Sequence, residues 1–296
     1  MIDFRMETFL CVCEYMNFTH AAEKLGLSQP AVSQHIKYLE NEYEAELFTR
    51  DKRRLKLTAS GEILRNALLT MRNDEITLKK RIHEEKTNNK TISFGVTMTI
   101  GEYAVIPAIS EYIKRHKNIN FNIRYGNTKK LLNYLDHGKI DFAIVEGYFD
   151  AEQYSSLNFS KESYIAVCSS KHIFEKPVNC INDLTSERLI TRESGSGTRS
   201  ILTRSLAVKN MDISCFKHII EVENIHSMVS LLLNDCGIAF LYKAAVKEEI
   251  KKGRLMEIPL IDFNITHEFT FLWNKDSMFG EEYIDIFNEI QMINHK

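Results

Sequence analysis

The sequence lacks a strong net charge of either sign. It holds 38 basic and 40 acidic residues in 296, so its net charge is −2. Even residues 1–90 are nearly neutral, with 15 basic and 14 acidic side chains. A domain that binds nucleic acid through its overall charge would be strongly basic. Any affinity for DNA must therefore come from a local cluster of basic residues.

Paired cysteines are also missing. The six cysteines stand at positions 11, 13, 168, 180, 215 and 236, and no two form a CxxC pair. Cys11 and Cys13 are too close within one expected helix for easy disulfide geometry, and the histidines are scattered without metal-site spacing. We expect reduced thiols, as in a cytosolic protein, and no metal. A thiol-sensing pair, such as Cys180 with Cys215, stays open as an alternative.

Long apolar runs are absent as well. No run approaches the roughly 18–20 residues that a membrane span needs, and Asp3, Arg5 and Glu7 interrupt the N-terminus where a signal peptide would be apolar. The hydrophobic fraction of 44% still allows real cores. We expect a soluble, cytoplasmic protein of two or three compact units with no membrane partner.

What the chain does contain, in residues 18–58, is a predicted helix–turn–helix followed by a basic hairpin. Thr19 is expected to cap a short first helix. This helix turns Ala21, Ala22 and Leu25 inward. Gly26 can then end it in the left-handed conformation.

A second helix is predicted to begin at Ser28, with Pro30 in the first turn, where a missing N–H costs little. Its apolar stripe consists of Val32, Ile36 and Leu39. Its opposite side carries Pro30, Ser33, Gln34 and Lys37. An apolar back with a face of small donors and acceptors suits a helix that reads the major groove. The alternative is an ordinary helical hairpin whose polar face meets water.

A basic run follows the second helix. The cluster comprises Arg50, Lys52, Arg53, Arg54 and Lys56, with Asp51 as its one acid. Apolar residues flank or alternate with it as in a short two-stranded wing, namely Leu47, Phe48, Leu55 and Leu57. Such a wing would place its basic tip beside the phosphate backbone of a duplex. A solvated charged turn is the alternative.

Residues 59–85 are predicted to continue as one long helix, since residues 62–85 contain neither glycine nor proline. Its apolar residues follow a heptad pattern, with Glu75 at the missing position: Leu64, Leu68, Met71, Leu78 and Ile82. At ~1.5 Å per residue the helix would reach about 40 Å, too long for one small domain. We expect this stripe to form a homodimer seam. An amphipathic helix lying on its own domain is the alternative.

From residue 91 the pattern changes to alternating strands and helices. Strands are expected at 92–96, 120–125, 140–145, 164–168, 189–190, 216–220, 237–241 and 268–273. Helices are expected at 103–116, 129–137 and 283–292, with another beginning near 228. Buried apolar strands that alternate with helices imply a parallel sheet flanked by helices. The overall fold class is therefore α/β, in two units.

Two loops in this region have the composition of a ligand site. They span residues 95–103 and 192–199, each between an expected strand and a helix, where open α/β sheets bind ligands. Hydroxyls, free N–H groups and small residues suit an anion, and Arg192 and Arg199 add positive charge. Neither loop is a dinucleotide or P-loop signature. The predicted ligand is a small carboxylate, phosphate or sulfur oxyanion, and ordinary capped loops are the alternative.

The sequence shows no set of residues that would indicate an enzyme active site. An enzyme in the α/β region would need a nucleophile–base pair or a metal cluster. His226 is expected to cap or line a helix, and Cys236 stands in a turn without an evident base. We therefore expect no catalytic residue and no cofactor.

The N-terminal segments together resemble the winged helix–turn–helix of LysR-type transcriptional regulators. The matching pieces are Phe9-Leu10, Phe18-Thr19-x-Ala21-Ala22-x-x-Leu25, Ser28-Gln29-Pro30-Ala31-Val32-Ser33, Ile36-x-x-Leu39-Glu40, Leu47-Phe48-x-Arg50-x-x-Arg53 and Leu57-Thr58-x-x-Gly61. The resemblance implies a DNA-binding domain at 1–58, a linker helix and hinge at 59–90, and at 91–296 an effector-binding domain similar to a type 2 periplasmic binding protein. Its lobe I would cover about 91–162 and 267–296, and its lobe II about 163–266.

The resemblance implies a sequence-specific, DNA-binding transcriptional regulator, dimeric or tetrameric, on a roughly palindromic double-stranded site. RNA polymerase becomes a candidate partner. Expected contacts to bases come from Gln29, Pro30, Ser33 and Gln34, and to phosphates from Lys37, Arg50, Arg53 and Arg54. Thr19 and Ser28 complete the expected DNA-binding set. The alternative is a small-molecule binding protein whose N-terminal helices only dimerise.

The same resemblance places a small effector at the two loops. Residues at matching positions are Thr97, Thr99, Ser196, Gly197 and Thr198, with Thr128 at a third place. Neighbours expected to contribute are Met98, Ser194, Gly195 and Arg199. The loops also resemble regulators of carbon fixation or sulfur assimilation, which implies an anionic effector. Those regulators usually have proline where this chain has Ser194.

Overall fold

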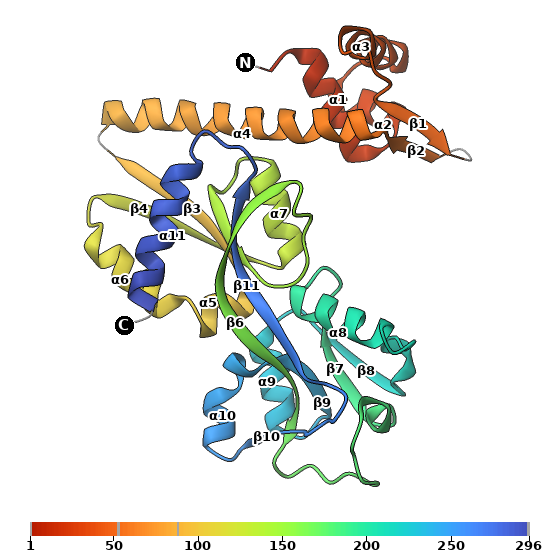
Figure 1. The fold of residues 1–296 in the computed structure, drawn as a ribbon, viewed down its shortest axis with the longest axis vertical. Coiled ribbons are helices and arrows are strands. Elements are labelled where there is room, and N and C mark those ends of the chain that lie inside the picture. Colours follow the sequence, from red (N-terminus) through yellow and green to blue (C-terminus); the bar gives the residue numbers. More distant parts are fainter. Residues whose placement is uncertain (1, 52–53, 88, 295–296) are drawn as a thin grey trace.

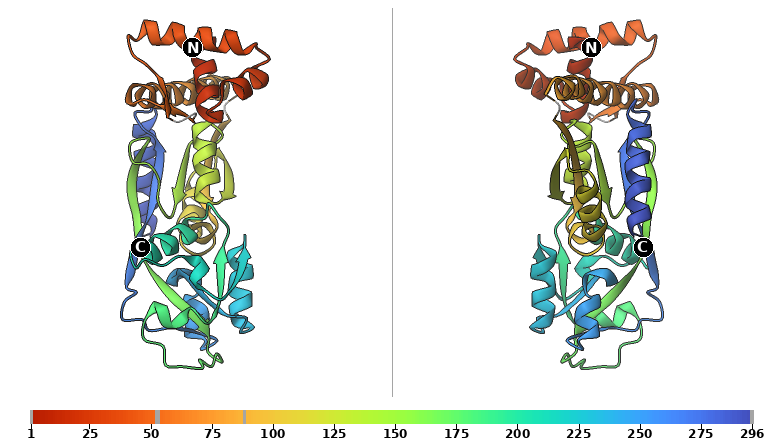
Figure 2. Two further views of the ribbon diagram at one scale, coloured as in Figure 1. Left: turned by 90° about the vertical axis from the view of Figure 1, so that its right-hand side faces the viewer. Right: turned by 90° about the vertical axis from the view of Figure 1, so that its left-hand side faces the viewer.

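The computed structural model describes residues 2–51, 54–87 and 89–294. The molecule is elongated, with the N-terminal helices and the long helix α4 across one end (Figure 1). Lobe I lies against α4, and lobe II forms the opposite end of the molecule (Figure 2). The N-terminal helices and α4, lobe I and lobe II thus follow one another along the long axis.

The N-terminal domain is a helix–turn–helix with a hairpin. Its elements are α1 (Phe4–Tyr15), α2 (Phe18–Leu25), α3 (Gln29–Glu42), β1 (Phe48–Asp51) and β2 (Arg54–Leu57). Val32, Ile36 and Leu39 of α3 are buried with Phe9 and Val12 of α1. Burying each such side chain contributes about 1.5–3 kcal/mol. The apolar stripe predicted for the second helix is confirmed, and it fixes which face of α3 points outward.

The start of α2 differs from the prediction. Asn17, not Thr19, is the N-cap, because α2 begins one residue before Thr19. The Asn17 Oδ1 accepts hydrogen bonds from the backbone N–H groups of Thr19 (2.8 Å) and His20 (3.2 Å). The other two expectations are confirmed: Gly26 ends α2 with φ +66°, and the Ser28 Oγ accepts from the Ala31 N–H at 3.3 Å.

The hairpin predicted after α3 is present. β1 and β2 pair antiparallel, with Phe48 opposite Leu57 and Asp51 opposite Arg54. Leu47 is buried, and Phe48 and Leu57 pack on the same core as α3. This wing is therefore anchored to the domain by its apolar side. Residues 52 and 53, which include the predicted phosphate contact Arg53, lie outside the described residues.

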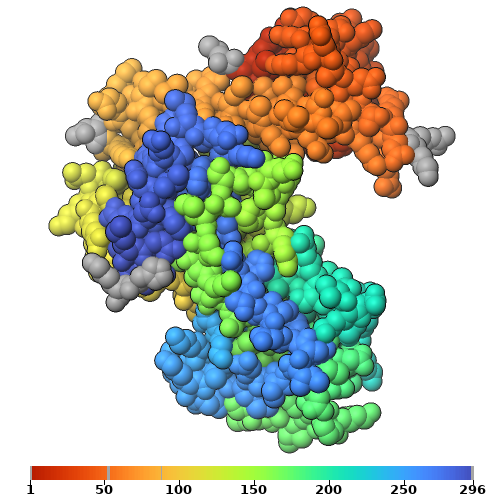
Figure 3. Space-filling model, in the orientation of Figure 1, coloured from red at the N-terminus to blue at the C-terminus, as the bar shows by residue number. Residues whose placement is uncertain are grey.

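Helix α4 (Ala59–Thr87) is 29 residues long, which corresponds to about 44 Å. It packs along lobe I while the N-terminal domain projects beyond one end (Figure 3). One part of the heptad prediction is wrong. Leu68 is buried in the core of the N-terminal domain and Leu64 packs against that core, because the first turns of α4 close that domain before the helix leaves it.

The effector-binding region has two lobes. Lobe I contains β3 (Lys90–Thr97), α5 (Met98–Tyr103), α6 (Ile106–Arg115), β4 (Ile119–Gly126), α7 (Thr128–Asp136), β5 (Phe142–Val145) and α11 (Gly280–Asn294). Lobe II contains β7 (Arg188–Arg192), α8 (Gly197–Ala207), β8 (His218–Val222), α9 (Ile225–Leu233), β9 (Ile238–Tyr242), α10 (Lys247–Lys251) and β10 (Leu255–Glu257). Two long strands, β6 (Tyr154–Ser169) and β11 (Ile265–Asn274), run from one lobe into the other (Figure 1).

These strands form one continuous mixed sheet in the order β4-β3-β5-β11-β6-β9-β7-β8, with β10 paired to β6. Pairing is parallel within each lobe, at β3–β4, β3–β5, β7–β8 and β7–β9. It is antiparallel wherever β6 or β11 takes part. The predicted parallel sheet thus holds inside the lobes only. The two connecting strands make both lobes share a core, in which Phe271 and Phe240 belong to one apolar cluster.

Two further sequence predictions need correction. The strand expected at 164–168 begins ten residues earlier, because residues 154–163 form the first part of β6, where buried and exposed residues alternate against β11. The helix expected at 103–116 is α6, which begins at Ile106 with Pro107 in its first turn. The segment 95–103, expected to be a loop, contains an additional short helix, α5. Within the described residues, no helix is long and apolar enough to cross a membrane.

Candidate nucleic-acid interface and interlobe site

Helix α3 lies at the end of the molecule farthest from lobe II (Figure 2). Gln29, Pro30, Gln34 and Lys37 are exposed there, and Ser33 is half-buried. The Gln29 Nε2 donates to the Ser33 Oγ at 2.8 Å, so both side chains lie on this side. The structure thus brings the predicted base-reading residues of α3 together on one accessible surface.

The wing and the start of α2 lie beside this surface. Thr19, Gln29 and Arg50 line one hollow of about 260 Å³, together with Asn17 and other residues. The Thr19 hydroxyl can donate to a phosphate oxygen, and Arg50 adds a guanidinium that can fork onto a phosphate. The hollow therefore has the chemistry of a contact to the phosphate backbone.

The basic cluster of the wing is partly neutralised. The Lys56 Nζ lies 2.8 Å from the Asp51 Oδ2, across the hairpin. Arg50 and Arg54 are exposed. Exposed ion pairs contribute little to stability, but Asp51 lowers the local charge that Lys56 offers a duplex. We therefore rank Arg50 and Arg54 above Lys56 as phosphate contacts among the described residues of the wing.

Helix α4 has a solvent-facing apolar surface. Met71, Leu78 and Ile82 are 58%, 43% and 52% exposed, and Ile63 is exposed in the same helix. The other side of α4 carries Asn73, Thr77 and Glu84, which are buried against the rest of the chain. Three of the five apolar positions of the predicted heptad pattern, Met71, Leu78 and Ile82, thus lie at the surface.

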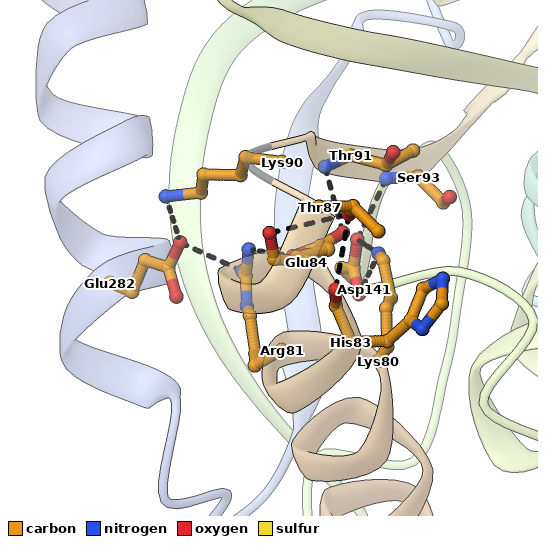
Figure 4. Close-up of polar contacts among 10 residues, drawn as sticks. All are labelled: Lys80, Arg81, His83, Glu84, Thr87, Lys90, Thr91, Ser93, Asp141 and Glu282. Carbon is orange, nitrogen blue, oxygen red and sulfur yellow. Dashed lines mark hydrogen bonds and ion pairs between the residues drawn. The ribbon is translucent and has the colours of Figure 1, made fainter.

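A group of charged residues, which we name the α4 clamp, joins the C-terminal half of α4 to lobe I (Figure 4). It comprises Lys80, Arg81, Glu84, Lys90, Asp141 and Glu282. The Lys80 Nζ lies 3.0 Å from the Asp141 Oδ2, and this carboxylate also accepts from the Ser93 N–H at 2.7 Å. Since Ser93 lies in β3, Asp141 connects α4 to a strand of the lobe I sheet.

The second part of the α4 clamp reaches the last helix. The Glu282 Oε1 of α11 forms ion pairs with the Arg81 Nη2 and with the Lys90 Nζ, each at 2.8 Å. Glu84 accepts from the backbone N–H of Thr91 at 2.8 Å. These contacts tie α4 to the start of β3 and to α11.

At the boundary of the two lobes, four predicted effector residues converge on one residue that the sequence analysis missed, Glu146. Its carboxyl group accepts hydrogen bonds from the hydroxyls of Thr97 (2.9 Å), Thr99 (3.3 Å) and Thr198 (2.7 Å). The Thr128 hydroxyl donates to the backbone carbonyl of Glu146 at 2.6 Å. We name the hydroxyls of Thr97, Thr99 and Thr198 the threonine nest.

Burial dominates the electrostatics of this cluster. Glu146 is 2% exposed. Burial raises the pKa of its carboxyl group, and the hydrogen bonds from Thr198 and Thr97 and the positive charge of Arg192 partly oppose this shift. A signal for Glu146 existed in the sequence: it is the first polar residue after a buried parallel strand, at the carboxyl end where ligand sites form.

The remaining loop residues lie around a neighbouring cavity of about 470 Å³. Thr128, Gly195, Ser196 and Gly197 line this cavity. Further lining residues are Lys129, Asp136, Tyr148, Gln153 and Ser200. Both lobes contribute, since α7 belongs to lobe I and α8 to lobe II. We call this space the interlobe cavity.

Three predicted effector residues point elsewhere. Ser194 is exposed, Met98 packs against the apolar cluster of lobe II, and Arg199 forms an ion pair with Glu221 of β8. Arg192, which was expected to add positive charge, pairs with the neighbouring Glu193 at 2.9 Å. Both guanidinium groups are thus already neutralised by carboxylates.

Among residues 2–51, 54–87 and 89–294, no group of three or more potential ligands is placed to hold a metal ion. His172 lies between Asp235 (2.6 Å) and Glu187 (3.3 Å). The six cysteines all fall in the described residues and are free thiols there. Cys180 is half-buried and Cys215 is exposed, and a thiol-sensing role for this pair stays a prediction.

Comparison with known families matches both parts of the chain. Residues 4–62 match the model described as "Bacterial regulatory helix-turn-helix protein, lysR family". Residues 85–279 match the model described as "LysR substrate binding domain". These two ranges include α3, the wing, the threonine nest and Glu146.

Individual proteins agree with this match. The chain is 24% identical to the HTH-type transcriptional regulator CysL of Bacillus subtilis, over 90% of this chain and 89% of CysL. It is 26% identical to the "Probable RuBisCO transcriptional regulator" of Emiliania huxleyi, over 94% of this chain and 90% of that protein. This relative agrees with the carbon-fixation branch that the loop motifs resemble.

Among solved structures, the regulatory domain of CcmR from Synechocystis PCC6803, in complex with 2-PG, has a TM-score of 0.59. It is 17% identical and covers 68% of this chain, which covers 97% of that domain. At this identity the likeness shows the fold of the two lobes. This chain, with its DNA-binding helix–turn–helix and its effector-binding domain, belongs to the LysR family of transcriptional regulators.

Proposed function

We propose that this chain binds a roughly palindromic DNA site as a homodimer and that a small effector between its lobes changes this binding. The observation that carries the proposal is the polar side of α3, exposed at one end of the molecule beside the wing. A helix with such a surface can enter the major groove without rearranging its own domain.

The apolar surface of α4 supplies the proposed dimer contact. Two copies that pair through Met71, Leu78 and Ile82 would bury side chains that one copy leaves in water. Two-fold pairing would carry one α3 to each half-site, with centres about 34–36 Å apart or a multiple of this. A tetramer and a contact with RNA polymerase are further steps of the same proposal.

We propose residues 1–58 as the DNA-binding domain, 59–90 as the linker and hinge, and 91–296 as the effector-binding domain. Lobe I would cover about 91–162 and 267–296, and lobe II about 163–266. The strands β6 and β11, which pass between the lobes, support these lobe boundaries.

We assign each expected DNA-binding residue to the bases or to the phosphates of the duplex. Gln29, Pro30, Ser33 and Gln34 would meet base edges and thymine methyl groups. Lys37, Arg50, Arg53 and Arg54 would meet phosphates, with Thr19 and Ser28 at the helix starts. The exposure of α3 and of the described wing residues supports this assignment.

The proposed effector is a small molecule in the interlobe cavity, and we keep the prediction that it is anionic. Lys129 lines the cavity and could pair with a carboxylate or phosphate, while Ser196 could donate its hydroxyl. The complex of CcmR with 2-PG supports this choice by analogy. The other predicted residues, Met98, Ser194 and Arg199, would act around the cavity rather than inside it.

The α4 clamp offers a path from effector to DNA. A ligand shifts a protein only by its differential affinity for two arrangements. An effector that favours one angle between the lobes would reposition lobe I, and the contacts of Asp141 and Glu282 would carry this to α4. We place the protein in the cytoplasm with its DNA and propose no catalytic activity for it.

The test uses a library of random DNA duplexes, from which the purified chain selects its preferred site. Gln34→Ala should lower affinity for the selected site by about 5- to 150-fold and leave random DNA unaffected, because only base contacts are lost. Lys37→Ala should weaken both kinds of DNA alike. Failure to enrich any sequence would favour the alternative of a small-molecule binding protein whose helices only dimerise.

A further inference from the structure

Glu146 fills the place that the sequence analysis reserved for an anionic ligand. Three hydroxyls of the threonine nest point at its carboxyl group at 2.7–3.3 Å. Hydroxyls donate to one acceptor at a time, so these three donors are already used. An external carboxylate would have to displace Glu146 before it could bind the same hydroxyls.

The carboxyl group also joins the two lobes. Glu146 directly follows β5 of lobe I, whereas Thr198 lies in the first turn of α8 of lobe II. The backbones meet closely here: a Cβ added to Gly197 would lie 2.2 Å from the carbonyl oxygen of Glu146. Only glycine allows this approach, and it sets the Thr198 hydroxyl beside the carboxyl group.

A purely structural role does not explain why the buried residue 146 is a glutamate. A buried carboxyl group is costly unless its lone pairs are satisfied, and a structural one usually bonds a buried base. Here the nearest base, Arg192, directs its guanidinium to Glu193 and to the backbone carbonyl of Glu223 instead. The carboxyl group is held by hydroxyls alone, as a bound ligand would be.

We propose that Glu146 is a built-in ligand: its carboxyl group occupies the anion site of the threonine nest and closes the two lobes without an external anion. This deepens the proposed function, because it rests on an effector site between the lobes. An effector of the wild-type protein would then bind in the neighbouring interlobe cavity, where Thr128 and Ser196 are lining residues.

The test is chemical rescue of Glu146→Ala by formate, followed by thermal unfolding of the full chain. Removing the carboxyl group leaves the threonine nest without its acceptor, so the midpoint should fall by about 5–10 °C. Sodium formate, compared with sodium chloride at equal concentration, should restore at least about 2 °C of this loss. Thr198→Val in the Glu146→Ala background should abolish the rescue.

Two control variants test whether rescue by formate is specific to the vacant carboxylate position. Glu146→Gln keeps the volume of the side chain and leaves no vacancy, so formate should not stabilise it. Val145→Ala opens an apolar vacancy at the adjacent, fully buried residue, and formate should not stabilise it either. Equal rescue of Val145→Ala, or no rescue of a folded Glu146→Ala, would overturn the proposal.

The wild-type chain provides a second measurement that does not depend on the folding of Glu146→Ala. Formate, acetate and phosphate should not bind the threonine nest of the wild type, so none of them should shift its unfolding midpoint by occupying that site. A saturable shift that disappears in Thr99→Val would show that the nest accepts an external anion with Glu146 in place, and the proposal would fail. Selection of a DNA site by the wild type is measured separately, so either proposal can fail alone.

Discussion

The polar groups at the DNA-facing end of this chain are open to solvent, whereas those of the interlobe site are buried and hydrogen-bonded to one another. On α3 and the wing, Gln34, Lys37 and Arg54 are exposed to solvent. Between the lobes, Thr97, Thr198 and Glu146 are buried and bonded to one another. The first region can take a large partner as it stands, whereas a ligand of the threonine nest would first have to break the hydrogen bonds to Glu146.

This difference separates the forces that govern the two regions. Exposed basic side chains act through electrostatics that salt screens. Buried hydrogen bonds are insensitive to salt, and leaving a donor without a partner costs about 1–3 kcal/mol. Changes at the two ends should therefore differ in magnitude and in their response to salt.

The largest effect is expected from Arg50→Ala combined with Arg54→Ala. Each phosphate contact contributes about 0.9 to the slope of log affinity against log salt. A dimer that loses four contacts should bind its site about 10³- to 10⁴-fold more weakly at 0.1 M salt, with the slope reduced by about 3.6. Equilibrium binding at several salt concentrations measures both. Lys114→Ala, a distant exposed residue paired with Glu111, serves as the control.

The next effect concerns the α4 surface. Leu78→Glu would place two carboxylates in the proposed dimer contact and remove two apolar side chains, worth together at least ~3 kcal/mol. The dimer dissociation constant, from sedimentation equilibrium, should rise about a hundredfold. His83→Glu adds the same charge at another exposed position of α4. An unchanged constant in Leu78→Glu would remove this surface from the dimer.

A smaller effect is expected from the α4 clamp. Asp141→Asn weakens the contacts to Lys80 and to the Ser93 N–H, and such a partly buried, charged pair should be worth about 1–3 kcal/mol. Denaturant unfolding should show this loss. Glu111→Gln, whose ion pair with Lys114 is exposed, should change stability by less than ~0.5 kcal/mol. Similar losses in both variants would contradict a special role for the clamp.

The smallest effect is a pH dependence at Glu146. Burial raises the pKa of this carboxyl group above its usual 4.5, so the folded chain holds the proton more tightly than the unfolded chain. Its contribution to stability is complete below that value and is lost as pH rises through the folded pKa. Unfolding free energies should therefore fall more steeply from pH 4.5 upward in the wild type than in Glu146→Gln, by at most ~1.4 kcal/mol per pH unit. Parallel profiles would contradict the shift.

The sequence predicted the DNA-facing end well because that site is local. The stripe of Val32, Ile36 and Leu39 and the cap at Ser28 lie within one short segment, so helical periodicity alone orients α3. The error at Thr19 was a shift of two residues at a helix start, where Asn17 competes as a cap. The burial of Leu68 needed knowledge of the domain that the start of α4 covers.

The interlobe site was less predictable because its residues are far apart in the chain. Composition identified Thr97, Thr99 and Thr198 as candidate donors, but their common acceptor depends on how β3, β5 and α8 meet. Glu146 follows an apolar strand and resembles any polar residue at a strand end. Only the tertiary arrangement shows that its carboxyl group satisfies the hydroxyls expected to bind an effector.

The most direct test of the central claim is a hydroxyl-radical footprint of the wild-type chain on a duplex that it has selected. Two α3 helices from one dimer should protect two half-sites related by a dyad, on the same face of the DNA and about 10 base pairs, or a multiple of this, apart. Protection of one isolated half-site, or no protection at a salt concentration where random DNA is released, would contradict the account.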